Sequence, residues 1–309
     1  MYLIPALFLL FTLACFSSCN NISDSLAFPH SPPQPSDSFA SYWFNGQAEI
    51  TTYRLNQARY GDIHPGTVTL IFVTEPFSLT KHVKPDQYSA ANADHINVLK
   101  LNMSIRFITG IYPYALMLSV FQPIALQQFP LALKTTASVQ EWCGQTFVQR
   151  NLKSGRYEEK SFSYFESEGD RTFLYDQAVL EDALWTLIRI NPEALPVGRQ
   201  RIIPGSLFHR LSHDRPEAQW ATLRKEVRDQ NKIDYYIEYE KIRRSLVITF
   251  DMNFPHRIHG WVETFPGSDG KLLASVAVAD KSLRIDYWNY HGRDDRALRQ
   301  QLNLPEDWQ

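Results

Sequence analysis

Cys143 is the residue of this 309-residue chain whose type most directly suggests covalent chemistry. A cysteine thiolate acts as a nucleophile when a histidine from elsewhere in the fold activates it. Dithiol exchange is excluded locally, because Thr146 stands where the second cysteine of a Cys-x-x-Cys pair would be. A free thiol is more often a buried side chain on a strand. The sequence favours this structural interpretation over a nucleophile.

Three carboxylates form a second candidate group, because Glu166, Glu168 and Asp170 occupy alternate positions. On one face of a strand such carboxylates could serve as acid and base or bind calcium. The same spacing is also typical of a solvated strand end that runs into a turn, and this interpretation is favoured. A hydrolase that uses Cys143 or these carboxylates therefore stays an alternative hypothesis.

Histidines offer a candidate metal site, since two pairs of them have short spacings. The candidate ligands are His209 and His213, His256 and His259, and His291. Pro204, Gly205 and Pro216 leave little room for a helix that would place the first pair on one face. On a strand, residues three apart point to opposite faces. The sequence therefore predicts neither a metal site nor a cofactor.

Aromatic side chains on the predicted strands are candidates for a binding surface. The residues concerned are Tyr235, Tyr236, Tyr239, Trp261, Tyr287 and Trp288. They could line a concave surface for an apolar or carbohydrate ligand. They could also pair across strands and fill the core, which is the favoured interpretation.

Several function classes lack support in the sequence. It contains no Gly-rich phosphate loop before a helix, no Gly-x-Ser-x-Gly, no His-Glu-x-x-His and no Cys-x-x-Cys. The formal charge is -2, from 31 basic and 33 acidic residues, so nucleic acid is not an expected partner. An enzyme is therefore disfavoured, without unusual catalytic arrangements being excluded.

The elements that must position these residues are mainly strands. Apolar and polar residues alternate from residue 99 to 107, which is typical of a half-buried strand. Weaker alternation predicts strands at 48–59, 67–77, 114–122, 131–140, 146–153 and 157–168. The C-terminal third predicts two hairpins, 233–239 with 246–250 and 257–265 with 272–280. Closely spaced strands with few helical patterns indicate antiparallel pairing.

Helical spacing is clear in one segment, residues 175–190, which ends before Pro192. Residues 216–230 suit either a helix or an exposed strand, and a strand is favoured because the C-terminal strands follow directly. The predicted fold class is mainly β, with one or two curved antiparallel, half-barrel-like sheets and one covering helix.

The N-terminus resembles a bacterial lipoprotein signal. An apolar run at 3–16 precedes Ser17, Ser18 and Cys19, and it is shorter than the roughly 20 residues of a spanning helix. We therefore expect a signal peptide at 1–18, lipidation at Cys19, a Ser/Pro-rich tether at 19–41 and a β-rich domain at 42–309. Cys15 is an alternative processed cysteine. A plain secretion signal or a simple membrane anchor are further alternatives.

Five short segments carry a resemblance to a known group of proteins. They are Tyr-Trp-Phe-Asn-Gly at 42–46, Gly-Ile-Tyr-Pro-Tyr at 110–114, Gln-Glu-Trp-Cys-Gly at 140–144, Ser-Tyr-Phe-Glu at 163–166 and Gly-Trp-Val-Glu-Thr at 260–264. With them the chain resembles uncharacterised Bacteroidetes-type lipoproteins, some of which are labelled "septum formation inhibitor Maf". The Ser-x-Ser-Pro-Arg-Arg signature of true Maf nucleotide pyrophosphatases is absent, so the resemblance does not imply that activity.

The strand pattern is also similar to lipoprotein-carrier domains, whose curved sheets bind acyl chains. The resulting expectation is a membrane-anchored envelope lipoprotein, at the outer rather than the inner membrane. It would be a non-catalytic binding or assembly module for a lipid, another apolar ligand or a partner protein. The alternatives are the hydrolase described above and a structural sheet that pairs through its edges.

Overall fold

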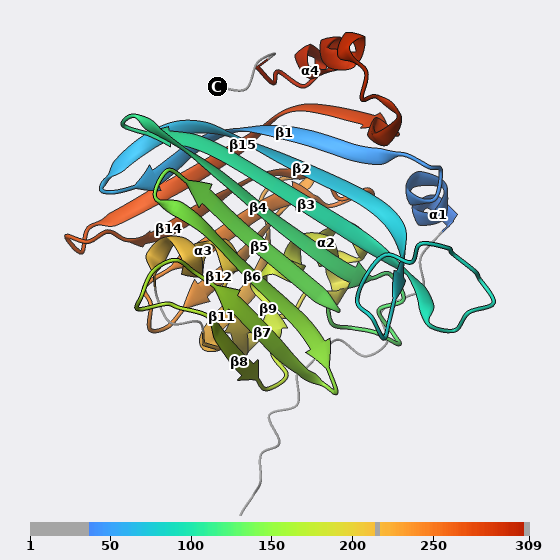
Figure 1. Ribbon diagram of the computed structural model, residues 1–309, viewed down its shortest axis with the longest axis horizontal. Helices are drawn as coiled ribbons and strands as arrows, with labels where there is room; N and C mark the ends of the chain where they lie inside the picture. The colour runs from blue at the N-terminus through green and yellow to red at the C-terminus, as the bar shows by residue number, and fades with distance from the viewer. Residues whose placement is uncertain (1–36, 214–216, 306–309) are drawn as a thin grey trace, which may run out of the picture.

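A single curved sheet of fifteen strands dominates the computed structural model, which describes residues 37–213 and 217–305 (Figure 1). The first eight strands are β1 (Ala48–Arg59), β2 (Asp62–Ser78), β3 (His95–Thr109), β4 (Tyr112–Pro123), β5 (Lys134–Glu141), β6 (Gly144–Lys153), β7 (Arg156–Phe162) and β8 (Arg171–Tyr175). The others are β9 (Val179–Leu180), β10 (Gly198–Ile203), β11 (Gln219–Val227), β12 (Lys232–Tyr239), β13 (Ser245–Asp251), β14 (Ile258–Pro266) and β15 (Leu272–Ile285).

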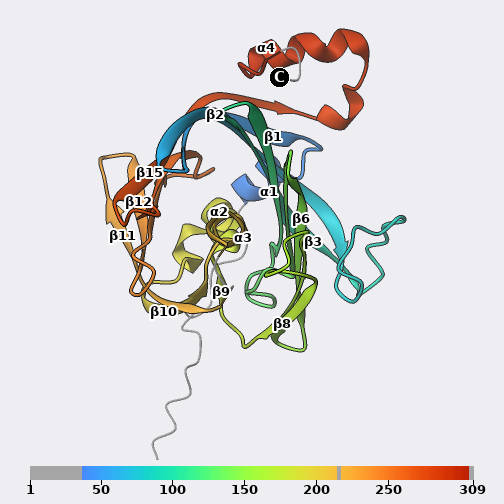
Figure 2. The same ribbon diagram turned by 60° about the vertical axis from the view of Figure 1, so that its left-hand side comes forward.

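The strand order explains the curvature of the sheet. The chain enters at β1 in the middle, runs strand by strand to the edge at β8, and continues at β9 on the opposite edge. It then returns strand by strand until β15 pairs antiparallel with β1. Only residues 176–178 separate β8 from β9, and a trans peptide advances the chain by about 3.8 Å per residue. The two edges are therefore close, and the open sheet curls around its contents (Figure 2).

Helix α2 (Glu181–Ile190) fills the concave side of the sheet, and all ten of its residues are buried. The prediction of a mainly β protein with a curved antiparallel sheet is confirmed. The predicted helix at 175–190 begins too early, because Tyr175 ends β8 and residues 179–180 form β9. The apolar residues of β9 continue the pattern of α2 only because β9 and α2 face the same core.

The prediction of one helix is also too low. The remaining helices are α1 (Asp37–Trp43), α3 (Ser206–Ser212) and α4 (Leu298–Gln301), with 3-10 turns η1 (Pro192–Ala194), η2 (Tyr287–Asn289) and η3 (Arg293–Ala297). α1 takes in residues 37–41, which composition placed at the end of the tether, and it buries Phe39 and Trp43. α4 lies outside the curve of the sheet (Figure 1).

Alternation along β3 shows how the sequence builds the core. Leu99, Leu101, Met103 and Phe107 are buried on the concave side, as their period of two predicts. Ile105 continues the same series but stays half-buried, because it lines a pocket. The adjoining strands supply matching rows, so burial of apolar area provides the main stabilisation.

The strand predictions differ from the structure in several places. They omit β8 and β10, and β2, β3 and β15 are longer than predicted. The strand expected at 157–168 ends at Phe162, and residues 163–170 form turns instead. Tyr287 and Trp288 lie in η2 and not on a strand. The favoured strand interpretation of 216–230 is confirmed by β11.

Buried ion pairs fix α2 within the sheet. At its end, Arg189 donates to both carboxylate oxygens of Glu49 on β1, at 2.5 and 2.7 Å. Both side chains are almost fully buried, at 1% and 2% exposure. Tyr42 donates a further hydrogen bond to Glu49. Burial acts to raise the pKa of Glu49, but Arg189 and these hydrogen bonds hold it below its ordinary value.

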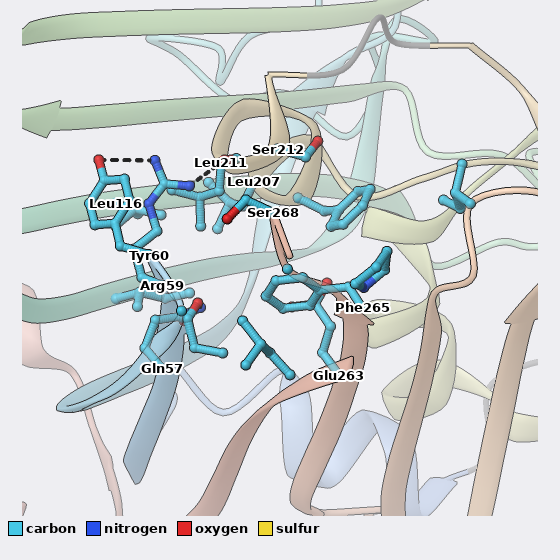
Figure 3. A pocket seen from close by; sticks show the side chains of 18 residues that line it. Gln57, Arg59, Tyr60, Leu116, Leu207, Leu211, Ser212, Glu263, Phe265 and Ser268 are labelled. Carbon is cyan, nitrogen blue, oxygen red and sulfur yellow. Dashed lines mark hydrogen bonds between the residues drawn. The ribbon is translucent and has the colours of Figure 1, made fainter. Parts of the chain in front are cut away.

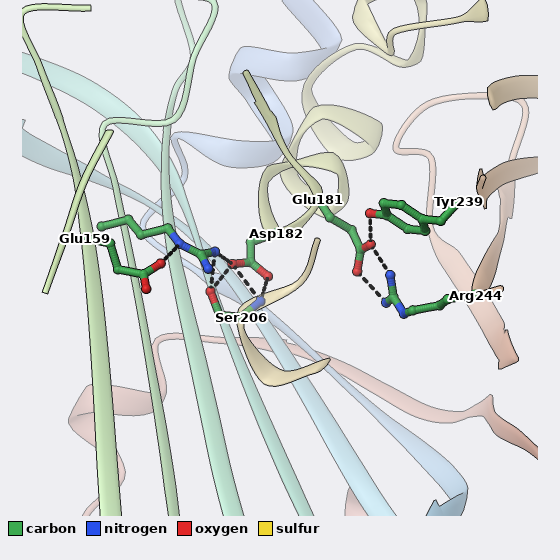
Figure 4. A network of polar contacts seen from close by, with 7 residues as sticks. Glu159, Glu181, Asp182, Ser206, Tyr239 and Arg244 are labelled. Atoms are coloured by element: carbon green, nitrogen blue, oxygen red, sulfur yellow. Dashed lines mark hydrogen bonds and ion pairs between the residues drawn. The ribbon is translucent and has the colours of Figure 1, made fainter. Parts of the chain in front are cut away.

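The start of α2 carries two acidic residues that pair with opposite parts of the sheet (Figure 4). Glu181 accepts from Arg244, which precedes β13, at 2.7 Å, and also from Tyr239. Asp182 accepts from Arg150 on β6 at 3.2 Å. Acidic groups at the first turn also suit the helix dipole. α2 is thereby joined to both halves of the sheet.

Replacing Glu49 by Gln is expected to lower the free energy of unfolding at pH 7 by about 3 kcal/mol, because Arg189 would stay buried without a charged partner. Urea unfolding followed by tryptophan fluorescence measures the change. The matched control is Glu240→Gln, which removes an exposed pair with Arg199 and should leave stability nearly unchanged.

The same pair predicts a pH dependence. A carboxylate whose folded pKa lies below its unfolded value contributes stability above the unfolded pKa, and this contribution is lost as pH falls through the folded pKa. The stability difference between the native protein and Glu49→Gln should therefore shrink below about pH 4. A constant difference down to acid unfolding would contradict the assigned pairing.

Candidate functional site

Helix α3 lies at one end of the curved sheet and has two different faces. Leu207, Phe208 and Leu211 form an apolar face that lines one pocket, while His209 and Arg210 line another. Seven residues are too few for a helix to be stable alone. α3 therefore depends on tertiary contacts for its position.

The start of α3 is held by the first turn of α2. The Ser206 backbone N–H donates to Asp182 at 3.0 Å, and the Ser206 hydroxyl donates to the same carboxylate (Figure 4). This carboxylate thus caps a helix in another segment. Gly205 is required here, since a Cβ at this position would lie 2.6 Å from an oxygen of Glu181.

An apolar pocket of about 480 Å³ lies between α3, the ends of β1 and β4, and the β14–β15 turn (Figure 3). Its apolar lining comprises Ala58, Ile105, Leu116, Leu207, Phe208, Leu211, Ile242, Phe265, Pro266 and Leu273. Most of these side chains are only half-buried, which leaves apolar surface open to a ligand. The volume falls within the range of about 300–1,000 Å³ that is typical of small-molecule sites.

Arg59 places a cation at the wall of this apolar pocket. Its guanidinium donates to the backbone oxygen of Leu211 and, at 3.3 Å, to the hydroxyl of Tyr60, so both acceptors are uncharged (Figure 3). The Arg59 Nε is buried and has no hydrogen-bond partner within the described ranges. Tyr60 in turn shares a 2.7 Å hydrogen bond with Tyr114. The polar part of the lining also includes Gln57, Ser212, Ser268 and Glu263, and Glu263 accepts from Arg244 at 2.7 Å. The pocket therefore combines apolar walls with a polar margin to which Arg59 contributes a guanidinium.

A polar pocket of about 230 Å³ lies on the other face of α3. His209 lines it, is 9% exposed, and has no hydrogen-bond partner on either ring nitrogen among residues 37–213 and 217–305. Burial, together with the nearby charges of Arg150 and Arg244, lowers the pKa of His209 to about 3. The imidazole is therefore neutral at pH 7.

Cys143 lies in a third pocket of about 200 Å³, which adjoins the other two through Arg59, Arg210 and His213. The prediction of a buried cysteine on a strand is wrong, because Cys143 is exposed in the β5–β6 turn. Its backbone N–H donates to Glu141 at 2.6 Å. The hydrogen bond to Glu141 and then desolvation raise the pKa of the thiol, which lowers the thiolate fraction.

The predicted carboxylate group is separated in the structure. Glu168 accepts from Arg210 and lies 2.6 Å from His213 Nδ1, whereas Glu166 and Asp170 are exposed. The three do not share a strand face, since they lie in the turns after β7. A histidine oriented by a carboxylate thus lines the pocket that contains Cys143.

The histidines are arranged differently from the sequence expectation. A helix does form after Gly205, and His209 and His213 both line the polar pocket. His259 pairs with Asp251 at 2.5 Å, and His256 contacts the backbone oxygen of the same residue. Within the described segments, no three His, Cys, Asp or Glu side chains are grouped so that they could hold a metal ion.

Three of the six aromatic residues considered as a binding surface lie in the core instead. Tyr235, Tyr239 and Trp261 are buried, and Trp261 packs against Trp185 of α2 with ring centroids 4.9 Å apart. Tyr235 also donates to the backbone oxygen of Pro196 at 2.7 Å. These three residues fill the core, as the favoured interpretation predicts, whereas Tyr236 and Tyr287 are half-buried and Trp288 is exposed.

Comparison with protein-family models, with curated protein sequences and with solved structures finds no match to this chain. Among the residues that the structure describes, no helix has both the length and the apolar character needed to cross a membrane. Cys15, Cys19, the signal peptide at 1–18 and residues 19–36 of the tether lie outside the described residues.

Sequence reasoning missed Arg59 and α3. The spacing of Leu207, Phe208 and Leu211 is helical, but nearby Pro and Gly residues argued against a helix. Arg59 has no local signal, because most of its neighbours in the pocket come from elements distant in the sequence, such as α3 and the β14–β15 hairpin.

The lowered pKa of His209 predicts the pH dependence of stability. The unfolded chain binds a proton near pH 6.5, while folded His209 does not until about pH 3, so stability falls as pH decreases below 6.5. When the pH is lowered from 7 to 5, the free energy of unfolding of the native protein should fall by about 2 kcal/mol more than that of His209→Phe. His291→Phe, at an exposed position, is the control, and urea unfolding at both pH values measures the difference. Equal losses in all three proteins would contradict a neutral buried His209.

Proposed function

We propose that this protein is a non-catalytic envelope lipoprotein that binds an amphiphilic ligand with an anionic or ester head and an acyl part. The observation that carries the proposal is the 480 Å³ pocket beside α3, which has open apolar walls and a buried Arg59 Nε that has no partner among the described residues. We place its anchor at Cys19 and its location at the membrane surface, the outer membrane being favoured.

The apolar walls supply the affinity for an acyl part. Leu207, Phe208 and Leu211 present half-buried side chains from α3, and Phe265 and Leu273 face them from the β14–β15 hairpin. Each methylene that leaves water gains about 0.8 kcal/mol. Even a partial acyl chain would therefore bind measurably.

Arg59 supplies the selectivity for the head group. A guanidinium forms stronger hydrogen bonds to charged oxygens than to neutral ones, and its present acceptors are a backbone oxygen and a phenol. A buried donor without a partner costs free energy until a ligand satisfies it. The arrangement therefore favours an amphiphile with an oxygen-rich head over a purely apolar molecule.

The test is native mass spectrometry with solvent extraction on the chain starting at Asn20, made in the periplasm of a heterologous host. We expect a stoichiometric lipid mass with the native sequence. Leu273→Trp should fill the pocket, so the lipid mass should disappear. Leu272→Trp, at the exposed neighbouring position, should retain the bound lipid. A ligand-free mass that persists after incubation with lipid vesicles would overturn the proposal.

The contribution of Arg59 is tested separately. Arg59→Gln should weaken lipid retention by about tenfold, as loss of one charge-assisted hydrogen bond predicts. The matched control is Arg54→Gln on the same strand, because Arg54 is exposed and pairs with Asp280. Equal retention by both variants would show that Arg59 does not hold the head group.

A second candidate function is a hydrolase, favoured by the shared pocket of Cys143 and His213 and by the contact of His213 with Glu168. The raised pKa of the thiol argues against it. We expect iodoacetamide to modify Cys143 slowly at pH 7, with a rate that rises through pH 8.5 and above. Rapid modification at pH 6 that His213→Gln abolishes would favour the hydrolase instead.

A further inference from the structure

We propose that the polar pocket on the opposite face of α3 binds a compact oxyanion, the chemistry shared by inorganic phosphate and a phosphate monoester. The pocket holds about 230 Å³ and has no lining residue in common with the apolar pocket. This site goes beyond the proposed lipid site and does not depend on it.

His209 is the first observation that points to a ligand. It is nine-tenths buried and lines the pocket, and neither ring nitrogen has a partner among the described residues. Buried polar atoms without partners are uncommon in folded proteins. A neutral imidazole has one N–H, which can donate to an oxygen of a bound anion.

The charges that line the pocket are the second observation. Three arginines and two glutamates line it, and both carboxylates are already engaged. Glu159 accepts from Arg150 at 2.5 Å, and Glu168 accepts from Arg210. Arg150 and Arg210 are engaged with these carboxylates in turn. Among the described residues, Arg171 is exposed and donates to the backbone oxygen of Ser167, without a carboxylate partner. Arg171 is therefore the cation of this pocket that an incoming anion can engage.

The electrostatic surroundings of His209 agree with this assignment. The nearby charges that act on it are the guanidinium groups of Arg150 and Arg244. These positive charges disfavour a cation beside His209 and favour an anion there. The donors also come from several elements, β6, β8 and α3, which suits a tetrahedral anion with oxygens in several directions.

Inorganic phosphate is the probe for the test. Isothermal titration of the full chain measures its affinity, and long-range nitrogen-proton NMR correlation of the imidazoles reports whether His209 is the contact. We expect saturable binding together with a change in the His209 nitrogen shifts. An absence of saturable binding, or binding that leaves His209 unchanged, would overturn the proposal.

Matched arginine variants locate the site. Arg171→Gln should weaken phosphate binding by about tenfold, as loss of one charged hydrogen bond predicts. Arg156→Gln is the control, because Arg156 is an exposed arginine of β7 that pairs with Asp176. His209→Phe should weaken binding as well, and since Arg171 is exposed, its variant tests the site even if His209→Phe does not fold. Equal binding by the two arginine variants would contradict the assigned site.

Glycerol 3-phosphate distinguishes the two sources of the anion. Tighter binding of glycerol 3-phosphate than of inorganic phosphate would indicate a phosphate group carried by a larger molecule. The reverse order would indicate a free anion. Both results support an oxyanion site. Loss of lipid retention in Leu273→Trp with phosphate binding retained would confirm that the two pockets are distinct sites.

Discussion

The charge pairs of α2 are the constraint on which the rest of the structure depends. Glu181 and Asp182 pair with Arg244 and Arg150 from opposite halves of the sheet, and Arg189 pairs with β1. Burying charges is costly unless geometry and further hydrogen bonds compensate. Here each carboxylate accepts more than one hydrogen bond. These pairs set the rotation and the depth of α2 more narrowly than apolar packing alone could, because an apolar contact has no direction.

α3 takes its place from this arrangement. The carboxylate of Asp182 both pairs with Arg150 and caps Ser206, and the close approach of Gly205 to Glu181 sets the starting point of the helix. A short helix fixed at its start presents one apolar and one polar face, so two chemically different pockets form beside it. The functional site is thus a consequence of how charge is buried in the core.

The sequence predicts the strands well, because alternation is a local signal. It predicts β1 with its observed bounds and the hairpin of β12 with β13. β9 is missed because two residues cannot show a period, and the helix expected at 175–190 absorbs it. Arg59 could not be predicted as a site residue, and His209 was predicted only as a candidate metal ligand. Their unpaired nitrogens arise only once distant segments have packed around them. The expected lipidation at Cys19 stays a prediction.

Both proposed ligands would contact side chains of α3, and this has a thermodynamic consequence. A helix of seven residues contributes little stability of its own, so a ligand that orders α3 further would spend part of its binding free energy on that ordering. A ligand that holds α3 from the apolar side lowers this cost for an anion on the polar side, and linkage requires the same effect in reverse. α2 would not take part in such coupling, because its ion pairs already fix it at both ends. The fold therefore separates a rigid central helix from a smaller helix on which two binding events can act together.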